Sequence, residues 1–172
     1  QKVLDAGANV EAAGKGGLRA LHLAARRGYT ELTRILLAAH ADPSCLHLQL
    51  RPLILAASKG HASVVAELLG AKADVSAAYA DGLTALHVAA KLNNGAECVS
   101  LLLGAGADVD ARGSVYGTTP LLAAASSGNA AVVALLLRAG ASVNVAGRGK
   151  GTTPLMQAAN ALAVDVVRSL LA

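Results

Sequence analysis

The hydrophobic positions of this chain recur in short clusters at a nearly constant spacing. Each cluster opens with a four-residue segment whose third position is Leu, and the residue before that Leu serves as a ruler. The steps between successive rulers are 32, 33, 35 and 34 residues, at Ala20, Pro52, Ala85, Pro120 and Pro154. A period of this length predicts a solenoid, in which stacked units bury their core between neighbours and leave one long surface free for partners.

The third unit shows which elements one period predicts. Residues 81–82 favour a tight turn, and Thr84 follows as a helix N-cap whose hydroxyl accepts an otherwise unpaired backbone N–H. A short helix with a small-residue face is expected at residues 86–90, and a second, more apolar helix at residues 98–103. Gly106 ends that helix in a backbone conformation with positive φ, which glycine adopts easily.

These segments closely resemble the ankyrin repeat, whose pattern runs Gly-x-Thr-Pro-Leu-His-x-Ala-Ala, Gly-His, Val-Val, Leu-Leu-Leu and Gly-Ala-Asp-Val-Asn. The resemblance covers essentially the whole chain, with matches at Gly60-His61, Val64-Val65, Val132-Val133, Leu135-Leu136-Leu137, Gly140-Ala141-Ser142-Val143-Asn144 and Gly7-Ala8-Asn9-Val10. It implies an all-α ankyrin-repeat solenoid of about five stacked helix-turn-helix units with projecting β-turns or hairpins. It also implies protein recognition without catalytic residues.

The period divides a single domain, residues 1–172, into repeats. Residues 1–12 are the end of a truncated repeat, residues 147–172 form an incomplete last repeat, and the four repeats between them are 13–45, 46–77, 78–111 and 112–146. Terminal units of a solenoid need polar outer faces, which neither Val3-Leu4 nor residues 166–171 provide. We therefore expect this chain to belong to a longer protein or a larger complex.

Departures from the repeat pattern distinguish the units. His40 and Lys72 stand where glycine usually follows the second helix, at a cost of about 1 kcal/mol each if the left-handed conformation is kept. Arg19 and Arg51 replace the capping Thr of the same two repeats, so we expect repeats one and two to open more readily. Asn93 and Leu162 stand where glycine usually separates the two helices. Longer turns before Pro120 and Pro154 are expected to extend the recognition surface.

Composition narrows the classes of function. The net charge is +4, but no run of Lys/Arg resembles a nucleic-acid tail, and aromatic residues make up 2% of the chain. Nucleic-acid binding is therefore not expected, and no apolar stretch approaches the ~18 residues of a membrane span. Cys45 and Cys98 occupy non-equivalent repeat positions, which indicates a reducing intracellular compartment, cytoplasmic or nuclear, with an organelle still possible.

The residues that suggest chemistry have simpler interpretations. Residues 147–153 contain Gly, Lys and Thr like a phosphate loop, but Lys150 is followed by Gly, so a flexible basic turn is expected. The resemblance implies hydrogen-bonding roles for His22, His61 and His87, while Cys45 and His47 form a close pair without further metal ligands. We therefore expect no catalytic residue, no metal site and no cofactor.

The resemblance implies two groups of partner-binding residues on the concave face. Residues that follow the Ala-Ala pairs are Arg26, Arg27, Lys59, Lys91 and Leu92. Residues at the turn tips are Lys15, Leu48, Leu50, Tyr79, Asp81, Arg112, Tyr116, Arg148 and Lys150. Because most of these charges are basic, an acidic or mixed partner surface is expected and binding should weaken with salt; an ordinary solvated face is the alternative.

Residues 45–50 interrupt the pattern. They stand where a polar turn is expected and alternate apolar residues at period two, like a strand with one dry face. Leu46, Leu48 and Leu50 would then form an exposed contact site, or would fold back onto adjacent turns.

The sequence therefore predicts a non-catalytic protein-interaction scaffold or adaptor. Two alternatives remain at this point: a regulatory or targeting segment of a longer enzyme or channel, and a structural subunit of a large assembly.

Overall fold

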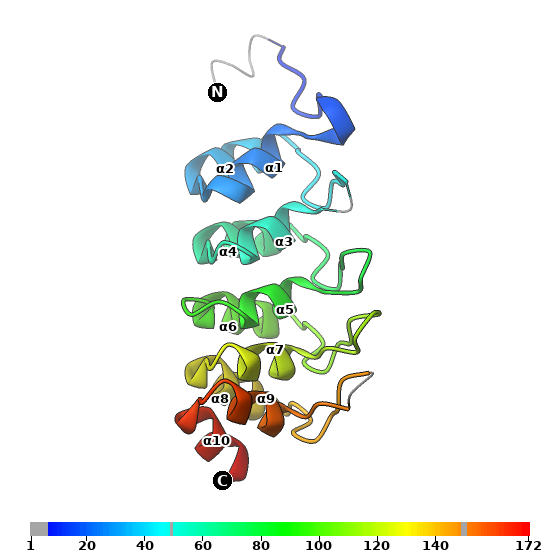
Figure 1. Cartoon of the computed structure of the whole chain (residues 1–172). Helices are drawn as coiled ribbons and strands as arrows, with labels where there is room; N and C mark the ends of the chain where they lie inside the picture. The colour runs from blue at the N-terminus through cyan, green and yellow to red at the C-terminus, as the bar shows by residue number, and fades with distance from the viewer. Residues whose placement is uncertain (1–6, 49, 149–150) are drawn as a thin grey trace.

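The computed structural model describes residues 7–48, 50–148 and 151–172. In these residues ten α-helices form five consecutive pairs, preceded by a 3-10 turn, η1 (Lys15–Gly17) (Figure 1). The helices are α1 (Ala20–Arg27), α2 (Thr30–Ala38), α3 (Pro52–Ala57), α4 (Ala62–Gly70), α5 (Ala85–Ala90), α6 (Ala96–Gly104), α7 (Pro120–Ser126), α8 (Ala130–Arg138), α9 (Pro154–Asn160) and α10 (Val164–Leu171). The predicted all-α solenoid is confirmed.

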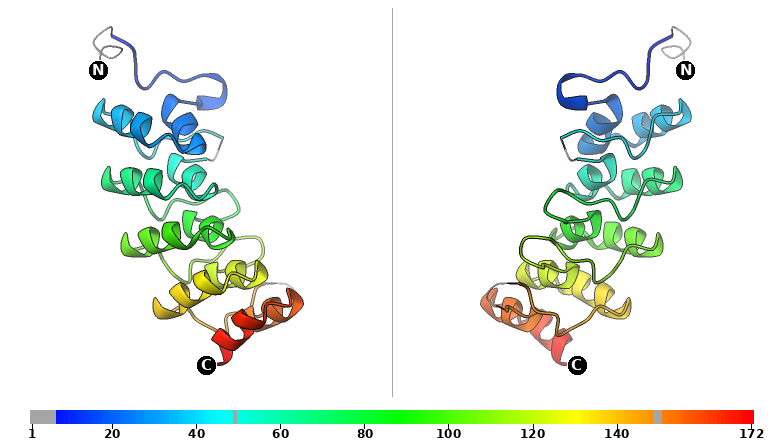
Figure 2. Two further views of the ribbon diagram at one scale, coloured as in Figure 1. Left: turned by 90° about the vertical axis from the view of Figure 1, so that its left-hand side faces the viewer. Right: turned by 90° about the vertical axis from the view of Figure 1, so that its right-hand side faces the viewer.

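The helices form two layers that run the length of the stack. The inner layer holds α1, α3, α5, α7 and α9, each in contact with the next, and the outer layer holds α2, α4, α6, α8 and α10 in the same way. The loop that leads into α1 and the four loops between pairs, which we call fingers and number from one to five in chain order, all project from one side of the stack (Figure 1). The orientation of the pairs changes gradually from one end to the other (Figure 2).

Small residues and N-terminal caps explain why the inner helices form and pack closely. The Ala-Ala pair of each of the first four inner helices is fully buried, so their backbones approach closely at this point. Thr119 and Thr153 accept the backbone N–H of the third helical residue at 3.2 and 3.3 Å. A proline at the first position of α3, α7 and α9 is suited to a turn whose N–H groups lack helical partners.

The ends of the first four outer helices use the left-handed backbone conformation, as the sequence predicts. His40 and Lys72 have φ of 65° and 67°, and Gly106 and Gly140 have φ of 86° and 87°. Leu162 also has positive φ, but Asn93 does not. With one residue inserted, the third repeat instead places Gly95, which has φ of −80°, where an added Cβ would overlap the carbonyl oxygen of Ala89.

The two ends of the stack differ in what the structure describes. Val3-Leu4 lies outside the described residues, so the expectation for that end stays a prediction. At the other end α10 is present, and Leu162, Val164 and Leu171 are exposed. In the described part of this last repeat, no polar unit covers the outer apolar side chains.

We expect His40→Gly and Lys72→Gly each to raise the free energy of unfolding by roughly 0.5–1 kcal/mol, because a left-handed residue loses its Cβ strain. Both side chains are exposed, so no buried contact is lost. Gly106→Ala and Gly140→Ala are the matched reverse changes, since an added Cβ meets no atom within 4 Å there. They should lower stability. Urea unfolding followed by circular dichroism measures all four, and unchanged midpoints would contradict the strain argument.

Candidate protein-interaction surface

The fingers are joined to one another by backbone hydrogen bonds. The Ser114 N–H donates to the Asp81 carbonyl at 2.6 Å, and the Arg148 N–H donates to the Tyr116 carbonyl, also at 2.6 Å. Nearer the start of the chain, His47 Nδ1 lies 2.7 Å from the Gly16 carbonyl oxygen. Neighbouring fingers therefore hold each other in place, which gives the finger side of the stack a fixed surface.

The finger-tip residues singled out by the sequence differ in exposure. Lys15, Asp81, Arg112 and Arg148 are exposed, and Leu48 and Tyr116 are each 71% exposed. Leu50 and Tyr79 are half-buried and pack against the core, so much of each side chain supports the fold. Burial, helped by the nearby Asp81 charge, raises the pKa of the Tyr79 phenol. Lys150 lies outside the described residues.

Residues 45–48 and 50 do not form the predicted strand with one dry face. A single antiparallel bridge joins His47 and Leu50, and Leu48 between them has φ of 47°. Cys45 is buried, Leu46 is 49% exposed, Leu48 is exposed and Leu50 is half-buried. The turn at Leu48 breaks the alternation, so Leu46 and Leu48 remain at the surface and only Leu50 folds back onto the core.

The basic residues of the inner helices lie at two adjacent positions of the repeat, at or just after the helix C-termini. Arg26 and Arg27 end α1, Lys59 follows the C-cap of α3, and Lys91 is the C-cap of α5. All four are exposed, and the salt bridges found among the described residues involve none of them. Cations are favoured at helix C-termini, so their placement costs little stability and leaves the charges available. Leu92, beside Lys91, is half-buried.

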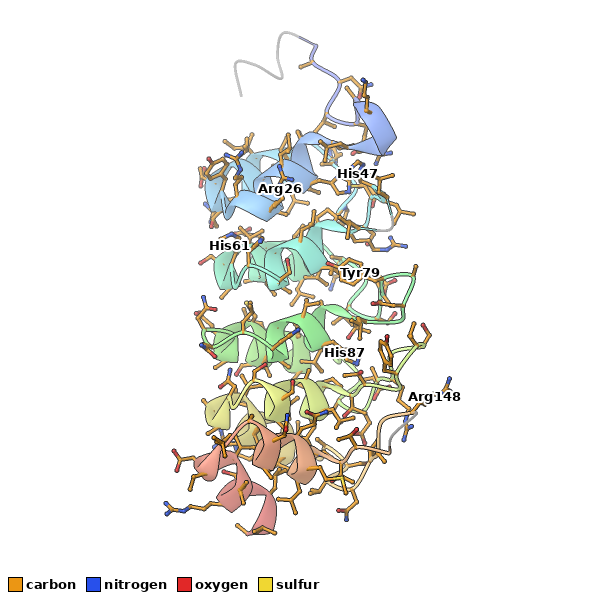
Figure 3. The ribbon with its side chains drawn as sticks, in the orientation of Figure 1. Arg26, His47, His61, Tyr79, His87 and Arg148 are labelled. Atoms are coloured by element: carbon orange, nitrogen blue, oxygen red, sulfur yellow. The ribbon has the colours of Figure 1, made fainter. Side chains whose placement is uncertain are left out.

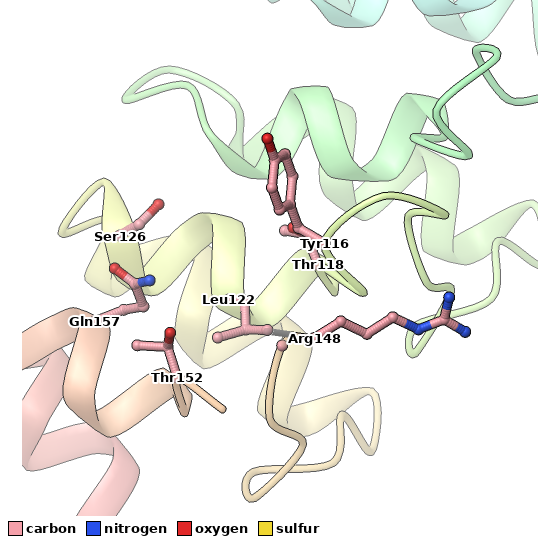
Figure 4. Close-up of a pocket in the computed structure, with 8 residues that line it drawn as sticks. Tyr116, Thr118, Leu122, Ser126, Arg148, Thr152 and Gln157 are labelled. Atoms are coloured by element: carbon pink, nitrogen blue, oxygen red, sulfur yellow. The ribbon is translucent and has the colours of Figure 1, made fainter. Parts of the chain in front are cut away.

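A groove lies between the fourth and fifth fingers, and sequence reasoning missed most of its lining. It encloses about 470 Å³ and is lined by Tyr116, Thr118, Leu122, Ser126, Gly147, Arg148, Thr152 and Gln157 (Figure 4). Tyr116 and Arg148 were singled out as tip residues. The one signal for the rest was the longer turns before Pro120 and Pro154, because these turns form the walls of the groove.

The repeat geometry is matched by comparison with known families. A model for ankyrin repeats, described as three copies, matches residues 2–79, 21–113, 53–147 and 86–172. This chain belongs to the ankyrin-repeat family. Among curated proteins, no match was found. Ankyrin repeats are generally protein–protein interaction modules and are typically non-catalytic.

Two histidines connect their own inner helices to the next finger: His22 in α1 and His87 in α5. The His22 and His87 Nδ1 atoms accept the backbone N–H of Arg19 and Thr84, at 3.3 and 3.1 Å. Each Nε2 then donates across the repeat boundary, His22 to the Cys45 carbonyl at 3.2 Å and His87 to the Thr118 carbonyl at 2.9 Å. These bonds confirm a structural role for both imidazoles (His87 in Figure 3).

His61 also bonds across a repeat boundary. Its Nε2 lies 3.3 Å from the Arg26 carbonyl oxygen, and its ring covers Gly28, where an added Cβ would lie 2.6 Å from Nδ1. Figure 3 shows His61 and Arg26 on neighbouring repeats. Gly28 is therefore required both for its positive φ and for this close approach.

Arg19 lacks the hydroxyl of a capping Thr and its buried Nε has no hydrogen-bond partner among the described residues, but other bonds support this position. The His22 ring still accepts the Arg19 N–H, and the Arg19 guanidinium forms an ion pair with Glu11. In the second repeat, the Arg51 guanidinium donates to the Ser44 carbonyl. These bonds replace part of what Thr supplies in later repeats. Whether the first two repeats open more readily stays a prediction.

The described residues contain neither a cluster of metal ligands nor a reactive thiol. No group of three or more His, Cys, Asp or Glu side chains in them is arranged to hold a metal ion. Burial raises the pKa of the Cys45 thiol to about 11 and also raises that of Cys98, so both stay protonated and unreactive at neutral pH. Within the same residues, each helix is too short or too polar to cross a membrane.

Burial lowers the pKa of His22 and of His87 below the ordinary value of 6.5. Below about pH 6.5 the unfolded chain therefore binds more protons than the folded chain. We expect the free energy of unfolding to be highest above this pH and to decrease as the pH falls below it. His22→Gln together with His87→Gln should lower stability at pH 7.5 by about 1–3 kcal/mol per site and flatten this pH dependence. Urea midpoints between pH 7.5 and pH 5.5 measure both effects.

The exposed His40 provides the control. His40→Gln should leave the pH dependence parallel to that of the parent chain, because its imidazole is exposed. If the urea midpoint of the double variant fell as steeply with decreasing pH as that of the parent chain, other groups would be the cause of the acid sensitivity.

Proposed function

We propose that this ankyrin-repeat chain is a non-catalytic scaffold or adaptor that binds a protein partner through the inner-helix face and the finger tips. The observation that carries the proposal is the row of exposed cations at two adjacent positions of the repeat: Arg26 and Lys91 at the first position after the Ala-Ala pair, and Arg27 and Lys59 at the second. Because the first three repeats each supply at least one of these cations, a partner that follows the stack meets a positive charge at successive repeats.

Charge alone gives this surface too little affinity. Exposed ion pairs contribute roughly 0.2–1 kcal/mol each and weaken with salt. A stable complex therefore also needs apolar contact, which the exposed Tyr116 and Leu48 and the half-buried Leu92 offer. The expected partner surface is acidic at its rim and apolar at its centre. Two free, buried cysteines support a reducing compartment for the complex.

The experiment begins with affinity purification and cross-linking mass spectrometry to obtain a partner. The triple variant Arg26→Glu, Arg27→Glu, Lys59→Glu should slow association at low salt by roughly tenfold or more, because charge pairs at the rim of an interface mainly steer encounter. Circular dichroism should show an unchanged fold, since all three side chains are exposed.

A matched charge reversal on other exposed basic residues, Lys72→Glu, Arg138→Glu and Arg168→Glu, is the control and should change association little. If both triple variants slow association equally, the effect is one of net charge. If neither slows it, the basic row is not the contact surface.

A further inference from the structure

The groove between the fourth and fifth fingers forms at a repeat that lacks the histidine bridge of the first and third repeats. In the third repeat, His87 fills the position after the helical Leu and donates to the Thr118 carbonyl of the next finger. In the fourth repeat that position is Leu122, which has no group to donate to the equivalent Thr152 carbonyl. The imidazole bridge is replaced by an apolar side chain that lines the groove.

A glycine keeps the groove open. Gly147 lines the wall opposite Leu122, and an added Cβ would lie 3.2 Å from the Tyr116 carbonyl oxygen and 3.7 Å from Leu122 Cδ1. The Gly147 N–H donates to the Thr152 carbonyl at 3.0 Å, which fixes the finger backbone. At Gly147 the wall therefore presents bare backbone to the groove.

The open groove joins an apolar floor to polar ends. Leu122 lies at the floor and is 5% exposed. At one end of the groove, Ser126 of α7 and Gln157 of α9 supply polar side chains (Figure 4). Tyr116, 71% exposed, rises at the finger end with Arg148 beside it. The Gln157 amide suits a peptide backbone because it donates and accepts hydrogen bonds, and the Ser126 hydroxyl, which donates to the Ala123 carbonyl at 2.8 Å, can still accept one.

The surroundings of the groove are positively charged. Arg148 lines the groove, Arg112 is exposed on the finger that supplies Tyr116, and the described lining residues include no Asp or Glu. Arg148 Nη1 donates to the Ser114 carbonyl at 3.3 Å, and its stem crosses Gly117, where an added Cβ would lie 2.8 Å from Arg148 Cγ. These contacts hold the exposed guanidinium at the rim with further N–H groups free for a carboxylate, which Arg binds in bidentate fashion.

We propose that this groove binds an extended acidic segment of a partner, with an apolar side chain on Leu122 beside Tyr116 and a carboxylate on Arg148. The proposal rests on the proposed protein-binding function and adds the chemistry of one contact. A volume of about 470 Å³ lies within the range of pockets that hold a compact ligand group. A nucleic-acid strand suits the groove less, because Tyr116 is its one aromatic lining residue and bases stack on successive rings.

The probe is a short fluorescein-labelled peptide of alternating Glu, Leu and Gly, and its counterpart carries Lys in place of Glu. Fluorescence anisotropy at low salt should show binding of the Glu peptide below about 1 mM and none of the Lys peptide. Two-dimensional amide NMR should place the largest shifts at Thr118, Thr152 and Gln157. Equal binding of both peptides, or shifts centred elsewhere, would overturn the proposal.

Variants of exposed residues test the two named contacts without endangering the fold. Tyr116→Ala and Arg148→Glu should each weaken peptide binding by roughly fivefold or more. Tyr29→Ala and Arg138→Glu make the same changes at exposed positions outside the groove and should leave the affinity within about twofold. Equal losses in the groove variants and the controls would also overturn the proposal.

The triple variant Arg26→Glu, Arg27→Glu, Lys59→Glu separates this proposal from the general function. Unchanged peptide affinity in that variant, with loss in Arg148→Glu, supports the groove as an independent site. In a second outcome the peptide fails to bind, while a protein partner binds and is weakened by the triple variant. That result would overturn the groove proposal and leave the proposed scaffold function intact.

Discussion

Every feature of this stack depends on the contact between one helix pair and the next. A pair of helices of six to nine residues exposes too much apolar surface to fold alone, so its Leu, Val and Ala side chains must be covered by neighbouring pairs. The buried Ala-Ala pairs allow inner helices to approach closely. Because the inner helices lie so close together, the chain has to turn sharply where an outer helix ends. This turn requires a left-handed residue, and it sets the direction in which the following finger projects.

The same constraint divides the residues of a repeat between stability and recognition. Positions that face the next repeat carry small or apolar residues, or an imidazole with both nitrogens bonded, as His87 has. Positions at inner-helix C-termini and finger tips face solvent, so Arg26 or Tyr116 can vary with little effect on packing. In such a stack, the exposed residues can therefore differ between proteins without loss of the fold.

Local signals allowed much of the fold to be predicted from the sequence. The left-handed conformations of His40 and Lys72 follow from their place in the repeat, since each outer helix must end in the same turn. At Asn93 the repeat pattern predicted less, because the inserted residue moves the close backbone approach to Gly95, beside the Ala89 carbonyl oxygen. The alternation in residues 45–50 misled for a similar reason: a turn at Leu48 interrupts it.

The groove was the hardest feature to predict because it belongs to no single repeat. Its two walls come from fingers that lie 34 residues apart, Tyr116 and Thr118 on one and Thr152 on the other. It also depends on the absence of a side chain at Gly147 and of an imidazole at Leu122. In the same stack, Ile54 occupies the position of Leu122 and is fully buried. An apolar residue at this position is therefore insufficient by itself, and the longer fingers that flank Leu122 are needed to open a groove beside it.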